Sequence, residues 1–326
     1  MRKRLIRFFR PATTDNPSSG ISCSVAELVE LRHLARSLSL KGSRPAYSIM
    51  SGSMLSKFRG RGMDYTESRV YTPGDDIRHL DWRVTARTGR LHTKLYTEER
   101  DRPVLTLIDF GPTLYFGTRE AFKSVIAARL AALIGWTAVL NGDRIGGLLA
   151  VPERKYELRP RAGRQGVLRL IRFLVEATAR IPDNPAGSNG LESLVQQALR
   201  SVKPGSRIFL ISDFFHLYDG LQADLARLSR HSDLILCQLI DPLELTPPPA
   251  GRYRITDGRR RVLLDTGNPE TFRAWRERFQ ARHAAVSRLA QNLKLPRLEI
   301  VSGQDLAGIM RRGLSLSRRN GNRRAA

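Results

Sequence analysis

The chain has 326 residues, of which 41% are hydrophobic and 26% are charged. This composition excludes an intrinsically disordered protein and a small protein stabilised by disulfides. Lys and Arg number 55 against 31 Asp and Glu, which gives a formal net charge of +24. Nucleic acid, an anionic membrane or an acidic protein is therefore a candidate partner, although Arg far outnumbers Lys and a GC-rich coding sequence produces the same excess.

The cysteines and the apolar segments argue against an exported or membrane-spanning protein. Cys23 and Cys237 are too few for a disulfide framework or a cysteine zinc site, which fits a reducing compartment. The apolar stretch 124–140 contains Arg129 and is shorter than the roughly 20 residues of a membrane span, so we expect a buried helix. Residues 1–10 are basic and lack the apolar core of a secretion signal. We predict a cytoplasmic protein and leave open a peripheral contact with the inner face of the membrane.

Composition divides the chain into four segments. Residues 1–20 form a basic, flexible N-terminus, and residues 311–326 form a basic, flexible tail. Residues 21–102 hold an N-terminal helix and an Arg- and Asp-rich segment, and residues 103–310 hold regular alternation of strands and helices. We therefore predict one large domain with an N-terminal extension.

Periodicity predicts the elements in chain order. Ser24 and Glu27 form a capping box that begins the first helix, and residues 91–98 form a strand in a segment that otherwise shows little periodicity. The strands expected after it are 104–109, 144–151, 156–158, 207–212, 234–240 and 297–301. The helices expected are 119–140, 165–179, 191–202, 221–229 and 269–293, with a hairpin turning at Asp257 and Gly258 and a short helix from Asp305. This alternation indicates an α/β fold with a doubly wound, mostly parallel Rossmann-like sheet and helices on both faces.

Two of the expected strands end in acidic residues. Asp109 follows the first strand, with Gly111 and Thr113 at alternate positions, and Ser212 and Asp213 follow a later central strand. Ligands of doubly wound sheets bind outside the carboxyl ends of the strands, and carboxylate and hydroxyl oxygens suit Mg²⁺. Asp109, Thr113 and Asp213 are therefore a candidate magnesium site. The competing interpretation is that the carboxylates cap the helices that follow.

The motifs LIDFGPT, GDRIGGLLA and FLISDFF resemble those of a von Willebrand factor A-like domain. The segment RGRGMDYTESRVYTPGDDIRHLDWRVTARTGRLHTKLYTEER before them resembles the signature of the bacterial domain of unknown function 58 family. The first loop of that family usually reads Asp-x-Ser-x-Ser, the metal-ion-dependent adhesion site. Here Gly111 and Thr113 replace the serines, and Ser188 and Asn189 stand where the next loop usually has Thr. The resemblance thus implies a degenerate metal site.

The resemblance also implies partners. Members of this family are commonly encoded beside MoxR-type AAA+ ATPases, so an ATPase of this type and a client protein are the expected partners. The Arg-rich segment has two interpretations, because guanidinium groups pair with carboxylates and stack on aromatic rings. It is either a network that fixes the segment to the domain or a surface that docks a partner. The candidate partner-binding residues are Arg59, Arg61, Glu67, Arg69, Tyr71, Asp75, Arg78, Asp81, Trp82, Arg87, Ser188 and Asn189.

Motifs of common enzyme classes are not found in the sequence. It contains no phosphate-binding loop of the P-loop type, no Gly-x-Ser-x-Gly elbow and no His-Glu-x-x-His. We therefore expect a non-enzymatic interaction adaptor that works with a MoxR-type ATPase in the assembly or maturation of protein complexes. The alternative is a protein that binds nucleic acid or an anionic membrane through its Arg-rich termini. A metal-dependent hydrolase is disfavoured, because no nucleophile or general base accompanies the carboxylates.

Overall fold

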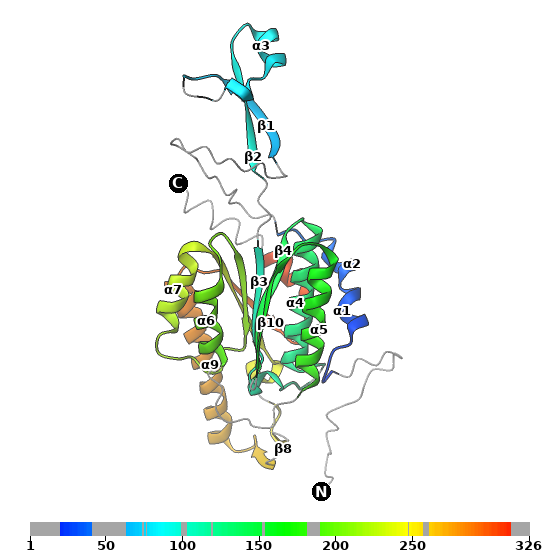
Figure 1. Ribbon diagram of the computed structural model, residues 1–326. Coiled ribbons are helices and arrows are strands. Elements are labelled where there is room, and N and C mark those ends of the chain that lie inside the picture. Colours follow the sequence, from blue (N-terminus) through cyan, green and yellow to red (C-terminus); the bar gives the residue numbers. More distant parts are fainter. Residues whose placement is uncertain are drawn as a thin grey trace. The chain divides into compact units, whose positions relative to one another are not determined.

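The computed structural model divides the chain into two compact units. One comprises Met1–Arg44 and Arg102–Ala326 and is called the sheet unit; the other comprises Pro45–Asp101 and is called the signature unit (Figure 1). The structure describes residues 20–40, 63–73, 75, 77–98, 103–118, 120–151, 154–180, 190–246, 248–256 and 261–313.

The sheet unit is built on a six-stranded sheet with the order β10-β7-β6-β3-β4-β5. Its strands are β3 (Pro103–Asp109), β4 (Arg144–Val151), β5 (Arg154–Arg161), β6 (Arg207–Ser212), β7 (Asp233–Ile240) and β10 (Arg297–Val301). All neighbouring pairs are parallel except β4 and β5, which are antiparallel. This confirms the expected α/β fold with a mostly parallel sheet, and every strand predicted for it is present.

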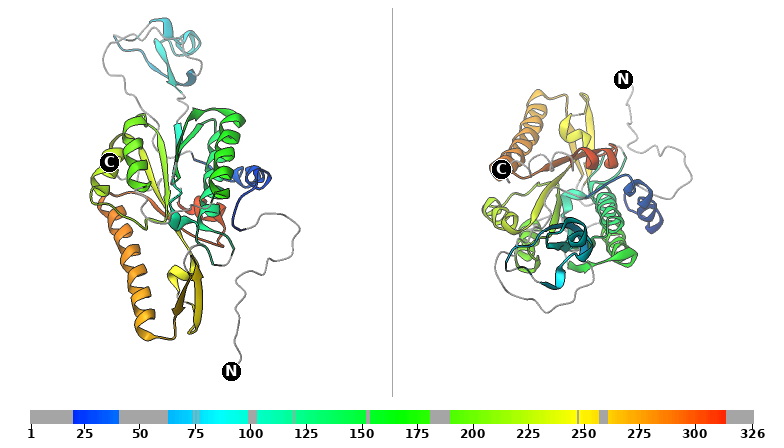
Figure 2. Two further views of the ribbon diagram at one scale, coloured as in Figure 1. Left: turned by 60° about the horizontal axis from the view of Figure 1, so that its bottom comes forward. Right: turned by 90° about the horizontal axis from the view of Figure 1, so that it is seen from above.

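Helices cover both faces of this sheet (Figures 1 and 2). On one face lie α1 (Val25–Glu30), α2 (Arg32–Ala35), α4 (Lys123–Leu140) and α5 (Gly163–Ala179). On the other face lie α6 (Gly190–Ser201), α7 (Leu221–His231) and α9 (Pro269–Asn292). Each face has its own hydrophobic core: the first core lies under α1, α2, α4 and α5, and the second lies under α6, α7 and α9. Successive residues of β3 point to opposite faces, so Ile108 belongs to the first core and Leu107 to the second. The apolar run of a strand buried on both faces arises in this way.

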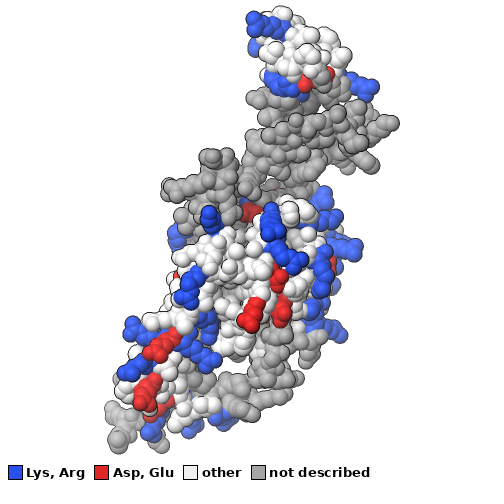
Figure 3. All heavy atoms as spheres, turned by 90° about the vertical axis from the view of Figure 1, so that its left-hand side faces the viewer, with Lys and Arg blue, Asp and Glu red and all other residues white. Residues whose placement is uncertain are grey.

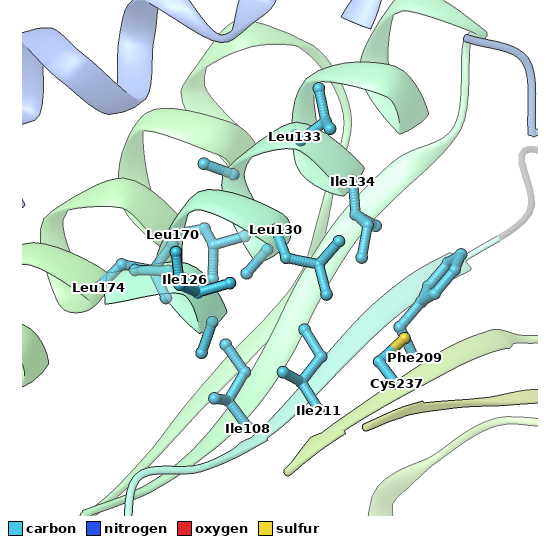
Figure 4. Close-up of a cluster of buried hydrophobic side chains, with 14 of the residues drawn as sticks. Ile108, Ile126, Leu130, Leu133, Ile134, Leu170, Leu174, Phe209, Ile211 and Cys237 are labelled. Carbon is cyan, nitrogen blue, oxygen red and sulfur yellow. The ribbon is translucent and has the colours of Figure 1, made fainter. Parts of the chain in front are cut away.

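Helix α4 forms the centre of the first core. Leu130, Leu133 and Ile134 of this helix are all buried, and Leu130 and Ile134 point toward the strands, where Ile211 lies (Figure 4). The helix is long and apolar enough to cross a membrane, but 83% of that stretch is buried inside the protein. It is therefore the buried helix that the sequence predicts.

Helix α4 begins at Lys123, whereas the sequence-based prediction begins it at Arg119. The preceding residue, Phe122, is extended, and the backbone N–H of Thr118 donates to the Asp241 side chain. Residues before Lys123 are thus bonded outside the helix. A contact between residues 123 positions apart sets this boundary, and periodicity does not show it.

The N-terminal helix packs on the sheet unit. Leu28 is fully buried against α4 and α5, and the Trp136 indole Nε1 donates to its carbonyl oxygen at 3.0 Å. Glu27, which forms the predicted capping box with Ser24, pairs with Arg129 at 2.5 Å. The sequence-based boundaries join this helix to the signature segment in residues 21–102, and the structure differs because the apolar face of the helix is buried by α4.

Two further elements extend the sheet unit. The antiparallel hairpin of β8 (Arg252–Thr256) and β9 (Arg261–Asp265) is present as predicted, while its turn residues Asp257 and Gly258 lie outside the described residues. The short helix α8 (Pro242–Leu245) follows β7 and was not predicted. The helix expected from Asp305 begins at residue 306.

The signature unit is an antiparallel hairpin with helical turns in its connection. Strand β1 (Met63–Val70) pairs with β2 (His92–Glu98), and between them lie a 3-10 helix, η1 (Ile77–His79), and α3 (Trp82–Thr88). Asp81 caps α3 through its carboxylate, and Gly89 ends the helix at a φ of 70°, a conformation that suits glycine. Of these elements only the strand at residues 91–98 is predicted from the sequence.

We expect Leu133→Ala to lower the free energy of unfolding by about 2–5 kcal/mol, because the leucine is fully buried and the substitution leaves a cavity. Leu140→Ala, on the same helix but with its leucine 52% exposed, is the matched control and should cost much less. Equal losses in chemical denaturation of the two variants would contradict this placement of α4.

Candidate functional site

Acidic side chains from three parallel strands gather at the carboxyl edge of the central sheet. Asp109 is the last residue of β3, while Asp213 and Asp241 follow directly on β6 and β7. Strand β3 pairs with β6, and β6 pairs with β7, so these strand ends are neighbours. The edge at which the sequence places the candidate site is therefore formed as expected.

A buried ammonium group lies among these acids. The Nζ of Lys123, the first residue of α4, donates to Asp213 Oδ2 at 2.7 Å and to Glu244 Oε1 at 2.8 Å. The side chains of Lys123, Asp213 and Glu244 are only 2%, 1% and 9% exposed. We call these three residues the lysine cluster. Its lysine and glutamate are absent from the sequence-based list of site residues.

The opposite charges within the lysine cluster favour the ionised forms of Lys123 and Asp213. Burial alone would lower the pKa of Lys123, but Asp213 and Glu244 raise it above its usual value. Burial would raise the pKa of Asp213, and the charge of Lys123 outweighs this effect and lowers it, with help from the hydroxyl of Thr113. Because the charges of Lys123 and Asp213 compensate each other, neither is left as an unpaired charge in the protein interior.

Backbone geometry after β6 fixes the orientation of Asp213. Its Oδ1 accepts the backbone N–H of Phe215 at 3.1 Å. Phe214 between them is fully buried with a φ of 52°, a left-handed conformation that is uncommon for a residue other than glycine. The Phe214 backbone N–H donates to the Ser212 hydroxyl at 3.0 Å. The turn thus points Asp213 toward Lys123.

Asp241 binds the loop that precedes α4 to the carboxyl edge of the sheet. It caps α8, whose capping box returns Glu244 Oε2 to the Asp241 backbone N–H. Its other oxygen contacts are with Thr118, whose backbone N–H and hydroxyl donate at 3.0 Å and 2.6 Å. The sequence analysis raised the capping interpretation for Asp109 and Asp213, whereas the capping carboxylate at this edge is that of Asp241. The sequence Asp-Pro-Leu-Glu after an apolar strand is the signal that could have shown it.

Asp109 is the least satisfied acid at this edge. Its Oδ2 accepts the Ser212 hydroxyl at 3.3 Å, whereas its buried Oδ1 has no hydrogen-bond partner in the described part of the chain. Burial, and then the nearby charge of Asp213, raise the pKa of Asp109 to about 7. Near neutral pH this carboxyl group is thus divided between its protonated and ionised forms.

The three predicted metal residues come together here, but their donor set does not fit a divalent cation. Asp213 is paired with Lys123, the raised pKa of Asp109 leaves that group partly protonated at neutral pH, and Gly111 offers no side-chain ligand. Among the residues that the structure describes, no three His, Cys, Asp or Glu side chains form a group that could hold a metal ion.

The predicted partner-binding residues lie mostly in the signature unit. Arg69 pairs with Asp75 at 2.7 Å, and hydrogen bonds from Thr72, with Arg69, lower the pKa of Asp75. Asp81 accepts the Ser68 hydroxyl at 2.7 Å and caps α3, and these hydrogen bonds lower its pKa. Tyr71 is half-buried, and Arg78, Trp82 and Arg87 are exposed. Glu67 lies in β1, and Arg59, Arg61, Ser188 and Asn189 lie outside the described residues.

Charge on the sheet unit is mixed on the face that Figure 3 shows. Lys and Arg side chains are spread over it with Asp and Glu side chains among them. Among the described residues on this face, acidic side chains therefore lie next to basic ones.

Comparisons with known proteins give one family and several uncharacterised relatives. Residues 67–288 match the model of a family described as "Protein of unknown function DUF58". Uncharacterized protein Rv1480 of Mycobacterium tuberculosis and uncharacterized protein Mb1516 of Mycobacterium bovis are each 30% identical over 291 residues, which is 88% of this chain and 89% of theirs. Their descriptions state no activity.

Solved structures show weaker similarity. BatB from Bacteroides thetaiotaomicron, described as a conserved hypothetical protein, is 12% identical with a TM-score of 0.42, over 67% of this chain and 99% of that one. An aerotolerance-related membrane protein from Bacteroides fragilis is 13% identical with a TM-score of 0.33, over 59% of this chain and 98% of that one.

The raised pKa of Asp109 predicts a pH-dependent stability. The Asp109 carboxyl group binds its proton more tightly in the folded state than in the unfolded chain. Its contribution to the free energy of unfolding is therefore complete below the pKa that it has in the unfolded chain, and this contribution is lost as the pH rises toward about 7. We expect Asp109→Asn to gain about 2 kcal/mol of unfolding free energy relative to wild type between about pH 5 and pH 8. Urea denaturation across this range measures it, with Asp219→Asn in an exposed loop as the control. A constant difference across the range would refute the buried, proton-holding Asp109.

Proposed function

We propose that this chain, which belongs to the DUF58 family of proteins of unknown function, is a non-enzymatic protein-interaction adaptor whose signature unit docks a partner. The sheet unit is in this proposal a von Willebrand factor A-like domain. The partner is a MoxR-type AAA+ ATPase, and the pair acts in the cytoplasm, with or without contact with the membrane surface, on the assembly or maturation of protein complexes.

The observation that carries the proposal is the exposure of large apolar side chains on the signature unit. Trp82 and Ile77 are each 66% exposed, and Val70 and Leu91 are 52% and 46% exposed. Val70 and Leu91 lie at one end of the hairpin, where the Tyr71 backbone N–H donates to the Leu91 carbonyl at 2.8 Å. Exposed tryptophan in such a setting is typical of interface hot spots.

The charges of the same unit favour a partner with acidic groups. Asp75 and Asp81 are engaged within the unit by Arg69, Thr72, Ser68 and the start of α3. Arg83, Arg87 and Arg90 are exposed on and after that helix. The unit therefore offers apolar and basic groups together, a combination that is common at protein interfaces, where Trp and Arg are enriched.

The carboxyl edge of the sheet does not favour a hydrolytic role. The Ser212 hydroxyl donates to Asp109 and accepts the Phe214 backbone N–H, so its hydrogen bonds orient neighbouring groups. The carboxylates of Asp213 and Glu244 are bound to Lys123. A general base must reach a reacting proton, and these carboxylates already hold another group.

We expect Trp82→Ala to weaken binding of a purified MoxR-type ATPase from the same organism by about tenfold or more, as loss of a hot-spot tryptophan does. Biolayer interferometry at moderate salt would measure the dissociation constant. Val262→Ala, which shortens an exposed side chain on the sheet unit, is the matched control and should bind as wild type does. Thermal unfolding of each variant would verify that the protein remains folded.

The alternative function gives a different result in the same assay. If basic termini carry binding to nucleic acid or anionic membrane, affinity falls steeply with salt and disappears on deletion of residues 1–10 and 311–326. Binding of nucleic acid or anionic vesicles that behaves in this way, with no binding of the ATPase, would replace the adaptor proposal.

A further inference from the structure

We infer that the ammonium group of Lys123 is the built-in cation of the carboxyl edge of the sheet, and that this edge functions without a divalent metal ion. The inference does not rest on the proposed function, because it concerns the edge itself and not the partner that binds the protein.

The geometry of the lysine cluster carries the inference. The Lys123 Nζ lies 2.7 Å from an oxygen of Asp213 and 2.8 Å from an oxygen of Glu244, so it bridges two carboxylates. These acids belong to different segments, one after β6 and one in α8. A divalent cation bound by acids at this edge would supply positive charge there. Here a side chain of the protein supplies the positive charge.

An aromatic ring also lies near the Lys123 ammonium group. The Nζ lies 5.9 Å from the centre of the Phe116 ring, within the range of a cation–π contact. An aromatic ring offers no oxygen ligand, whereas Mg²⁺ requires nearly octahedral oxygen coordination. The hydroxyl of Thr113, which the sequence assigned to the metal, helps instead to lower the pKa of Asp213. These groups complete the surroundings of a lysine, and while Lys123 holds both carboxylates a magnesium ion is short of ligands.

Further positive charge reaches the same carboxylates from α9. Arg282 interacts electrostatically with Asp213 and Glu244, and its guanidinium carbon lies 3.9 Å from the centre of the Phe215 ring. Phe215 is the residue whose backbone N–H bonds to Asp213. An entering divalent cation would thus meet two basic groups at this edge, Lys123 and Arg282. Their charges add to the cost of metal binding.

Titration of the full-length wild-type protein with Mn²⁺, followed by electron paramagnetic resonance, tests the inference without any variant. We expect no stoichiometric binding of Mn²⁺, and the same melting temperature in EDTA as in millimolar Mg²⁺. One bound Mn²⁺ per chain that is lost in Asp213→Asn would overturn the inference. Mn²⁺ that binds with unchanged affinity in Asp213→Asn lies elsewhere and leaves the edge without metal, as inferred.

Substitution of Lys123 gives a second test, in which the variant is expected to gain a stabilising response to divalent metal ions. Lys123→Ser leaves Asp213 and Glu244 without their counter-charge and opens space between them, so we expect a lower melting temperature that Mn²⁺ or Mg²⁺ raises by several degrees. Lys203→Ser, at an exposed loop position, is the matched control and should show no such rescue. Lys123→Met keeps most of the side-chain volume and serves if Lys123→Ser does not fold; it should be destabilised without a metal response. A Lys123→Ser variant as stable as wild type would show that the ammonium is dispensable.

Discussion

The buried ion cluster of Lys123, Asp213 and Glu244 is the interaction on which the carboxyl edge of the sheet depends. It joins the first residue of α4 to the turn after β6 and to the short helix after β7, segments that are 90 and 121 residues apart in sequence. Loss of one partner from such a cluster leaves an uncompensated charge in a site that water barely reaches. The cluster therefore fixes the positions of the start of α4, the turn after β6 and the helix α8 relative to one another.

Buried ion pairs are weak evidence for stability, because well-packed apolar residues of the same volume often serve as well. What the lysine cluster supplies is a defined geometry. Phe214 adopts a left-handed backbone conformation that places Asp213 against the lysine, and Thr118 is bonded to Asp241 beside it. Both loops are thereby held in one arrangement. The edge where doubly wound proteins usually bind ligands is occupied by the side chains of the chain itself.

Periodicity in the sequence predicts the sheet and most of its helices, because apolar strands and amphipathic helices are encoded locally. It fails where distant contacts decide. The start of α4 depends on Thr118 and Asp241, and the capping box at Ser24 shows a helix but not that α4 buries it. Strand β1 has the sequence MDYTESRV, whose polar residues give no strand pattern, and it exists through pairing with β2.

The candidate site shows the same division. Motif spacing finds Asp109, Thr113 and Asp213, because strand-end acids are visible in sequence. It does not find the counter-charge, since Lys123 stands at the start of an apolar helix and nothing nearby indicates its partners. Electrostatics decides the chemistry of such a site, and the deciding charge comes from a distant segment.

The charged groups at the edge of the sheet unit have partners within the unit, whereas several large apolar side chains of the signature unit are exposed to solvent. At the edge of the sheet unit Lys123 neutralises Asp213 and Glu244, Asp241 caps α8, and Asp109 is partly protonated near neutral pH, so the edge offers little unsatisfied charge to a partner. The signature unit is a hairpin with a short helix, and two strands alone bury little apolar surface, so Trp82 and Ile77 remain in solvent. Covering these side chains releases water and is favourable, whereas opening the lysine cluster exposes charges that already have partners. In the proposed adaptor, the free energy of association with a partner would therefore come mainly from the signature unit.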